Sequence, residues 1–170
     1  AFGSGAAETL QYLTEQLIPS LGGCSPSGGR RFLLGGYSLA GLLAIWSAYQ
    51  TSLFSGVAAA SPSVWFPGFC DYVQQNRIHT EAVYLSLGDR EERTKNPVMS
   101  KVGTAIRTIH ACLETAGIPC TLEWNKGNHF KNPDLRTAKA FSWLMDACQG
   151  DGSLDTVLTP DTLLSEEPSL

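Results

Sequence analysis

The chain has 170 residues and a formal net charge of −4, with 43% hydrophobic and 16% charged residues. This length and composition are typical of one globular domain with a sizeable core, and they exclude an intrinsically disordered chain. The weakly acidic charge excludes a basic field, so we expect no nucleic-acid partner. No apolar run is long enough to span a membrane, so we expect no membrane partner.

The chain has five cysteines at irregular spacing and no C-x-x-C pair. An odd number in this arrangement predicts neither a disulfide framework nor a zinc site. We therefore expect reduced thiols and no cofactor. We also expect a cytoplasmic location, because no signal-peptide pattern opens the sequence. The cysteines are Cys24, Cys70, Cys112, Cys120 and Cys148.

Short apolar runs alternate along the chain with segments of helical periodicity. Fully apolar runs predict buried strands, and apolar residues three or four positions apart predict amphipathic helices. In chain order we expect a helix around 10–18, a strand at 30–36, a helix at 38–50, a strand at 54–63, a helix at 68–78, a strand at 81–88, a helix at 96–117, a strand at 120–124 and a helix from 132 onward.

This alternation predicts an α/β fold, with a parallel sheet covered by helices on both faces. We expect residues 1–148 to form the domain. Residues 149–170 contain five acidic residues and no Lys or Arg, which predicts an extended acidic tail.

The last two expected helices both begin with Asn-Pro, where Asn is the N-cap and Pro lies in the first turn. Their apolar spacing also predicts which side chains face the core. These are Met99, Val102, Ile106, Ile109 and Leu113 in the first helix, and Ala138, Phe141, Leu144 and Met145 in the second.

The segment "GGYSLAG" lies where a buried strand is expected to turn directly into a helix. Gly36 and Ala40 are small residues two positions before and two after Ser38, as a nucleophile elbow requires. Such a turn lifts the serine hydroxyl above the sheet edge, and the backbone N–H of Leu39 would donate to an oxyanion. The alternative is that Ser38 only N-caps the helix.

A serine nucleophile needs an adjacent base, and the chain offers three histidines. His110 lies inside an expected helix, and His79 precedes a strand. Sites in parallel sheets form at the carboxyl ends of the strands. His129, in "GNHF" after the strand at 120–124, is therefore the expected base. The alternative is a loop histidine that makes structural hydrogen bonds.

The base needs a carboxylate that fixes its tautomer and stabilises the imidazolium. Asp89, Glu91 and Glu92 all follow the strand at 81–88. One of them is the expected orienting acid, and the others are expected to be solvated. The order serine, acid, histidine is that of α/β-hydrolases.

Five segments between Glu8 and Leu144 resemble the esterase family of α/β-hydrolases that includes siderophore esterases and S-formylglutathione hydrolases. They are "ETLQYLTEQLIPSL", "GGYSLAGLLAIW", "SPSVWF", "LSLGDREERTKNPVMSKV" and "GNHF". In that family the acid stands three positions after the glycine that ends the strand. The resemblance therefore favours Glu91 over Asp89, with Ser38 as nucleophile and His129 as base.

The sequence departs from the family pattern at two elbow positions, where Tyr37 replaces a usual histidine and Ala40 a usual glycine. The resemblance covers only the C-terminal portion of such esterases, which carry about four further strands upstream. Those strands complete the oxyanion hole and cover the edge at 31–36. An open edge would allow a homo-oligomer to form there.

Tyr37, Trp65 and Phe66 are the expected wall of the substrate pocket, and loop packing is the alternative role for Trp65 and Phe66. The residues and the resemblance together predict a serine hydrolase that cleaves small-molecule carboxylic esters. Two alternatives stay open: a thioesterase or acyltransferase with the same triad, and a hydrolase-like interaction module without turnover.

Overall fold

A computed structural model of the chain describes residues 5–22 and 31–148. The expected acidic tail at 149–170 and Cys24 lie outside the described residues. The elements are α1 (Gly5–Tyr12), η1 (Leu13–Leu17), α2 (Ile18–Ser20), β1 (Phe32–Tyr37), α3 (Leu39–Ser47), β2 (Phe54–Ala60), α4 (Phe69–Gln75), β3 (Ala82–Gly88), η2 (Met99–Lys101), α5 (Val102–Thr115), β4 (Cys120–Asn125) and α6 (Pro133–Ala147).

The four strands form one parallel sheet in the order β1-β2-β3-β4. Each strand is joined to the next through a helical segment, as a parallel ladder requires. The middle strands β2 and β3 are almost fully buried, so their runs of Val, Ala and Leu face protein on both sides. The parallel α/β fold predicted from the sequence is confirmed.

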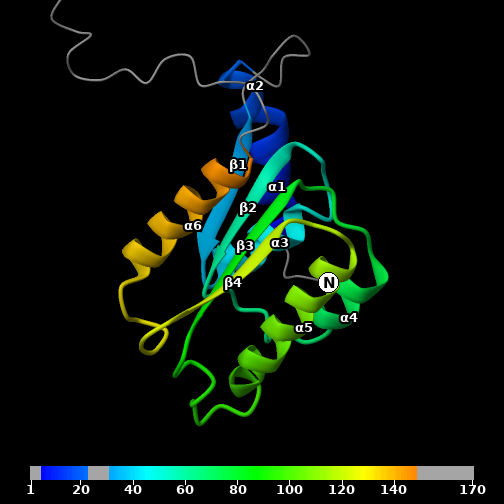
Figure 1. Ribbon diagram of the computed structural model, residues 1–170. Coiled ribbons are helices and arrows are strands. Elements are labelled where there is room, and N and C mark those ends of the chain that lie inside the picture. Colours follow the sequence, from blue (N-terminus) through cyan, green and yellow to red (C-terminus); the bar gives the residue numbers. More distant parts are fainter. Residues whose placement is uncertain (1–4, 23–30, 149–170) are drawn as a thin grey trace, which may run out of the picture.

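Helices cover both faces of this sheet (Figure 1). On one face α6 packs across the first three strands, and Ala58, Tyr84 and Leu144 lie in that core. On the other face α3 and α5 pack on the sheet, and Ile45 and Ile106 lie in a larger core. All four strands end at the same edge, so the loops that follow them meet there.

The core-facing side chains differ from the predicted set at three positions. Met99 is 38% exposed and Met145 53% exposed, and Ala138 is also exposed. Met99 belongs to the 3₁₀ turn η2, whose three-residue period takes it off the apolar face of α5. In α6 the buried residues are Arg136, Ala140 and Leu144, at a regular spacing of four.

The two Asn-Pro starts behave differently. The Asn96 side-chain oxygen accepts hydrogen bonds from the backbone N–H groups of Val98 and Met99, so it caps the turn that leads into α5. Asn132 makes no side-chain cap hydrogen bond, because its backbone adopts a left-handed conformation with φ 52°. The predicted side-chain cap is therefore wrong for α6, while Pro133 does occupy the first helical position.

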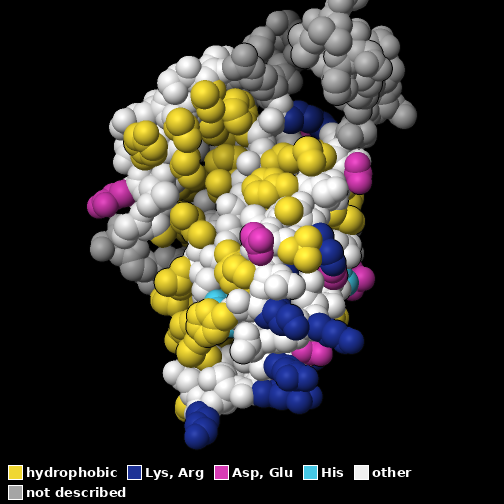
Figure 2. Space-filling model, turned by 90° about the vertical axis from the view of Figure 1, so that its left-hand side faces the viewer, with side chains coloured by type: hydrophobic (Ala, Val, Ile, Leu, Met, Phe, Trp, Pro, Cys, Tyr) yellow, Lys and Arg dark blue, Asp and Glu magenta, His cyan; other side chains and the backbone are white. Residues whose placement is uncertain are grey.

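Strand β1 lies at the edge of the sheet and pairs only with β2 among the described residues. Every residue of β1 is partly exposed, whereas β2 and β3 are buried. Seen from the side on which α6 lies, hydrophobic side chains gather in patches on the molecular surface (Figure 2). The unpaired side of β1 is thus open in the part of the chain that the structure describes.

In residues 31–148, Cys70, Cys112, Cys120 and Cys148 carry free thiols. None of the described helices combines the length and apolarity needed to cross a bilayer.

Candidate active site

Ser38 occupies the sharp turn between β1 and α3. Its backbone has φ 60° and ψ −119°, a conformation that residues other than glycine rarely adopt. Contacts with the surrounding structure must stabilise such a conformation. A Cβ atom at Gly36 would lie 2.5 Å from the carbonyl carbon of Ala40. The strand and the helix therefore approach so closely that position 36 has to be glycine.

Backbone hydrogen bonds hold this turn from both sides. The N–H of Ser38 donates to the carbonyl of Ala60 at the end of β2 (3.1 Å). The carbonyl of Ser38 accepts from the N–H groups of Leu42 and Ser63 (3.1 and 3.0 Å). The strained serine is thus fixed between its own helix and the loop after β2.

His129 lies in the loop between β4 and α6, at the same sheet edge as Ser38. Its Nε2 lies 3.0 Å from the Ser38 Oγ, and its Nδ1 lies 2.7 Å from the Glu91 Oε2. With the imidazole proton on Nδ1, the serine hydroxyl donates to His129 and His129 donates to the carboxylate. The three side chains form one continuous hydrogen-bonded chain.

Glu91 follows β3, and its side chain is only 4% exposed. Its Oε1 accepts hydrogen bonds from the backbone N–H of Gly88 (2.7 Å), the Ser61 hydroxyl (2.8 Å) and the Arg136 guanidinium (2.7 Å). Burial opposes ionisation of this carboxyl. Hydrogen bonds from His129, Ser61 and Gly88 nevertheless lower the pKa of Glu91 below its ordinary value. Glu91 is therefore a carboxylate at neutral pH.

The other two acids of the loop lie elsewhere. The Asp89 carboxylate accepts the backbone N–H of Gly127 at 2.8 Å, and Glu92 forms an ion pair with Arg107 at 3.4 Å. Neither makes a hydrogen bond to His129 among the described residues. The geometry thus brings Glu91, and not Asp89, to the histidine.

The remaining histidines lie away from this site. The His110 Nδ1 lies 3.4 Å from the Glu114 carboxylate, one turn further along α5. His79 precedes β3, and its backbone N–H donates to the carbonyl of Ala48. Both positions agree with the sequence-based exclusion of these two residues.

Leu39 begins α3, so its N–H is one of the first-turn donors that the helix itself does not use. Trp65 and Phe66 are half-buried and pack against the core beside α3 and α5. Their role as substrate-pocket residues stays a prediction. The Tyr37 hydroxyl is already bound, because it donates to the carbonyl of His129 at 2.6 Å. This contact gives Tyr37 a supporting position that the sequence did not suggest.

Three polar residues at the site were not predicted. Arg136 is 1% exposed and reaches Glu91 from α6, and Ser61 donates to the same carboxylate oxygen. The Ser63 hydroxyl lies 3.2 Å from the Ser38 hydroxyl. Ser61 and Ser63 belong to the "SPS" turn at the carboxyl end of β2, and that position was the available signal that they reach the site.

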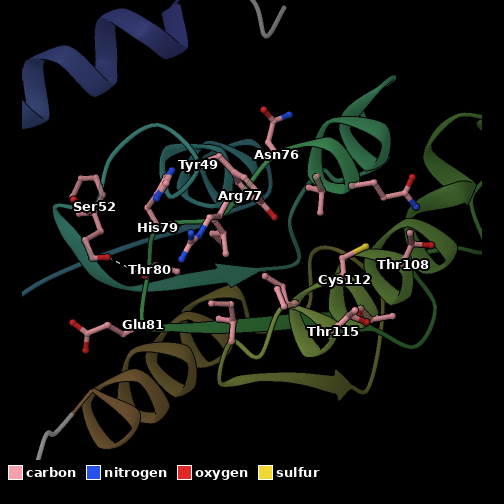
Figure 3. A pocket seen from close by; sticks show the side chains of 18 of the residues that line it. Tyr49, Ser52, Asn76, Arg77, His79, Thr80, Glu81, Thr108, Cys112 and Thr115 are labelled. Atoms are coloured by element: carbon pink, nitrogen blue, oxygen red, sulfur yellow. Dashed lines mark hydrogen bonds between the residues drawn. The ribbon is translucent and has the colours of Figure 1, made fainter.

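Two cavities lie outside this cluster. One, of about 920 Å³, opens at the amino ends of β2 and β3, where Tyr49, His79 and Cys112 contribute to its lining (Figure 3). It is at the opposite end of the sheet from Ser38. The other, of about 320 Å³, lies beside the loop of His129 and includes Arg90, Lys126 and Lys131. In the described residues no group of three or more His, Cys, Asp or Glu side chains is arranged to hold a metal ion.

Comparison with solved structures supports the fold. The chain is similar to the siderophore hydrolase EstA from Aspergillus nidulans, with a TM-score of 0.64 and 17% identity over 85% of this chain and 59% of that one. It is also similar to the enterobactin esterase FES from Shigella flexneri, with a TM-score of 0.61 and 19% identity over 83% of this chain and 38% of that one.

The described residues thus have part of the α/β-hydrolase fold. The chain spans 59% and 38% of the lengths of these two proteins. No protein-family model and no curated protein sequence matches it.

Proposed function

We propose that the protein is a serine hydrolase that cleaves carboxylic esters, with Ser38 as nucleophile, His129 as general base and acid, and Glu91 as the orienting carboxylate. The observation that carries the proposal is the unbroken chain of hydrogen bonds from Ser38 through His129 to Glu91, at 3.0 and 2.7 Å. A strained backbone at the serine supports it, since such strain is found at functional sites. The names of the two similar proteins, a siderophore hydrolase and an enterobactin esterase, agree with ester cleavage.

In this reaction the Ser38 Oγ attacks the acyl carbon while its proton passes to the His129 Nε2. The tetrahedral oxyanion is stabilised by the Leu39 N–H at the start of α3. The intermediate then expels the alcohol, which takes the proton from His129, and leaves an acyl group on Ser38. A water molecule, deprotonated by His129, attacks that ester, releases the acid and restores the serine.

Glu91 has the supporting role in each step. Its carboxylate holds the proton on Nδ1, so that the Nε2 lone pair faces the serine. It also stabilises the imidazolium that forms when His129 takes the serine proton. Because the pKa of Glu91 is lowered, this carboxylate remains charged through the whole neutral range.

Hydrolysis of an activated aryl ester tests the proposal. The Ser38→Ala and His129→Ala variants are expected to lose the activity, and Ser52→Ala, which lies in the cavity at the other end of the sheet, is expected to keep it. Full activity in either of the first two variants would refute the proposal. Partitioning of the acyl group between water and added alcohols or thiols separates the esterase from a thioesterase or acyltransferase.

An interaction role is a second candidate, favoured by the open side of β1. Unpaired backbone groups on an edge strand can pair with a strand of another molecule. Sedimentation over a range of concentrations tests this candidate. A homo-oligomer would support it, and a monomer at every concentration would count against pairing between copies.

A further inference from the structure

Arg136 carries the most deeply buried charge in the described part of the chain. Its side chain extends from the first turn of α6 and is only 2% exposed. Burial of a guanidinium destabilises the folded protein unless the group is paired and fully hydrogen-bonded. The hydrogen-bond partners of Arg136 therefore indicate its role.

The guanidinium binds Glu91 itself and the residues that directly precede Ser38 and His129. Its Nη1 donates to the Glu91 Oε1 at 2.7 Å and to the Tyr37 hydroxyl at 3.2 Å, and Tyr37 directly precedes Ser38. Its Nη2 donates to the carbonyl of Asn128 at 3.1 Å, and Asn128 directly precedes His129. One planar group thus joins the end of β1, the loop after β3 and the loop before α6.

The contact with Glu91 also decides which carboxylate oxygen faces the histidine. Oε1 is occupied by Arg136, Ser61 and the N–H of Gly88, and Oε2 is left for His129. Rotation of the carboxylate would break three charge-assisted hydrogen bonds, and one of them is also the ion pair with the guanidinium. A fixed carboxylate in turn fixes the imidazole.

We propose that Arg136 is a positioning residue of this active site, which orients Glu91 toward His129 and so keeps the imidazole facing Ser38. The inference rests on the function proposed above. The titratable groups that contact Arg136 are Glu91 and Tyr37, and His129 contacts the Glu91 carboxylate. No other charged side chain pairs with either residue in residues 5–22 and 31–148.

Loss of the guanidinium has two consequences. A neutral side chain removes a positive charge from beside the Glu91–His129 pair, so the pair takes up a proton more readily and the acid limb of activity moves to higher pH. It also frees the carboxylate to rotate. A misplacement of about 1 Å at a reacting group costs about 100-fold in rate.

The test measures the rate at which a fluorophosphonate modifies Ser38, as a function of pH and by intact mass. In that reaction the Ser38 oxygen bonds to phosphorus, fluoride leaves, and His129 takes the serine proton. We expect Arg136→Met to react about 100-fold more slowly, with its acid limb shifted to higher pH. Arg136→Lys keeps the charge and loses the planar fork. Its acid limb should stay near that of the wild type, and its rate should lie between those of the wild type and Arg136→Met.

Arg107→Met is the matched control, because Arg107 pairs with Glu92 on the surface and does not contact the site. An unchanged rate and acid limb in Arg136→Met would overturn the inference. If Arg136→Met does not fold, a wild-type rate in Arg136→Lys overturns it. If the wild-type chain itself is not modified at Ser38, the proposed function fails instead, so the two failures can be told apart.

Discussion

The hydroxyl of Tyr37 donates a hydrogen bond of 2.6 Å to the backbone carbonyl of His129, which lies 92 positions further along the chain. This contact ties the residue before the serine to the loop of the histidine. We expect Tyr37→Phe to lower the rate of ester hydrolysis about tenfold, as the loss of one hydrogen bond at the reacting centre would.

The same substitution leaves the carbonyl of His129 without this donor and removes one partner of Arg136. We therefore expect the free energy of unfolding to fall by about 1–3 kcal/mol. Urea unfolding measures the stability and steady-state kinetics measure the rate. A variant with wild-type values of both would show that the contact does not position His129.

Ser63 makes a further testable contact. Its hydroxyl lies 3.2 Å from that of Ser38, and its N–H donates to the Ser38 carbonyl. We expect Ser63→Ala to retain its fold, because the backbone bond remains, and to lower the rate of ester hydrolysis by less than about tenfold, the equivalent of one hydrogen bond. A drop as large as that of Ser38→Ala would mean that Ser63 acts as a nucleophile, contrary to this account.

Gly36 tests the elbow itself. A Cβ atom there would lie 2.5 Å from backbone atoms of Ala40, which cannot move without displacing α3. We expect Gly36→Ala to destabilise the protein by about 1–3 kcal/mol and to abolish modification of Ser38. Gly5→Ala is the control, because a Cβ at Gly5 would meet nothing within 4 Å. Equal stability of the two variants would contradict the close packing of β1 against α3.

The lowered pKa of Glu91 predicts that the protein becomes less stable at acidic pH. Its pKa is lowered in the folded protein, so between the folded pKa and the ordinary value of 4.5 the unfolded chain binds more protons. The contribution of Glu91 is therefore complete above 4.5 and is lost as the pH falls through the folded pKa. We expect the unfolding free energy of the wild type to decline in this range.

The Glu91→Gln variant should lack that part of the decline. At neutral pH it should be less stable by about 3–5 kcal/mol, because Arg136 is left buried without its counter-charge. Urea unfolding of both proteins at neutral and acidic pH gives the comparison. Parallel pH curves for the two proteins would show that Glu91 is not the carboxylate responsible.

The strands and helices could be predicted because their patterns are local. Buried parallel strands are continuous apolar runs, and the elbow is marked by the small residues Gly36 and Ala40 within five positions. The histidine could be selected because only His129 follows a strand. These inferences need the order of the strands and their direction, but not the packing of side chains.

Local patterns alone predicted neither the acid nor the role of Arg136, and only the resemblance to the esterase family favoured Glu91. Asp89 and Glu91 both follow β3, and the local sequence does not separate them. The structure does, because the Glu91 oxygen meets Gly88, Ser61 and Arg136. An arginine in a helix usually predicts a solvent-facing position, and the burial of Arg136 depends on distant partners at the end of β1 and in the loops after β2 and β3.

We expect Ser38 to be an activated nucleophile in this 170-residue chain. Intact mass after treatment with a fluorophosphonate tests this most directly, with Ser38→Ala as the control. We predict one adduct per chain that is absent from the variant. A folded wild-type protein that gains no adduct, or a Ser38→Ala protein that gains the same one, would contradict the account.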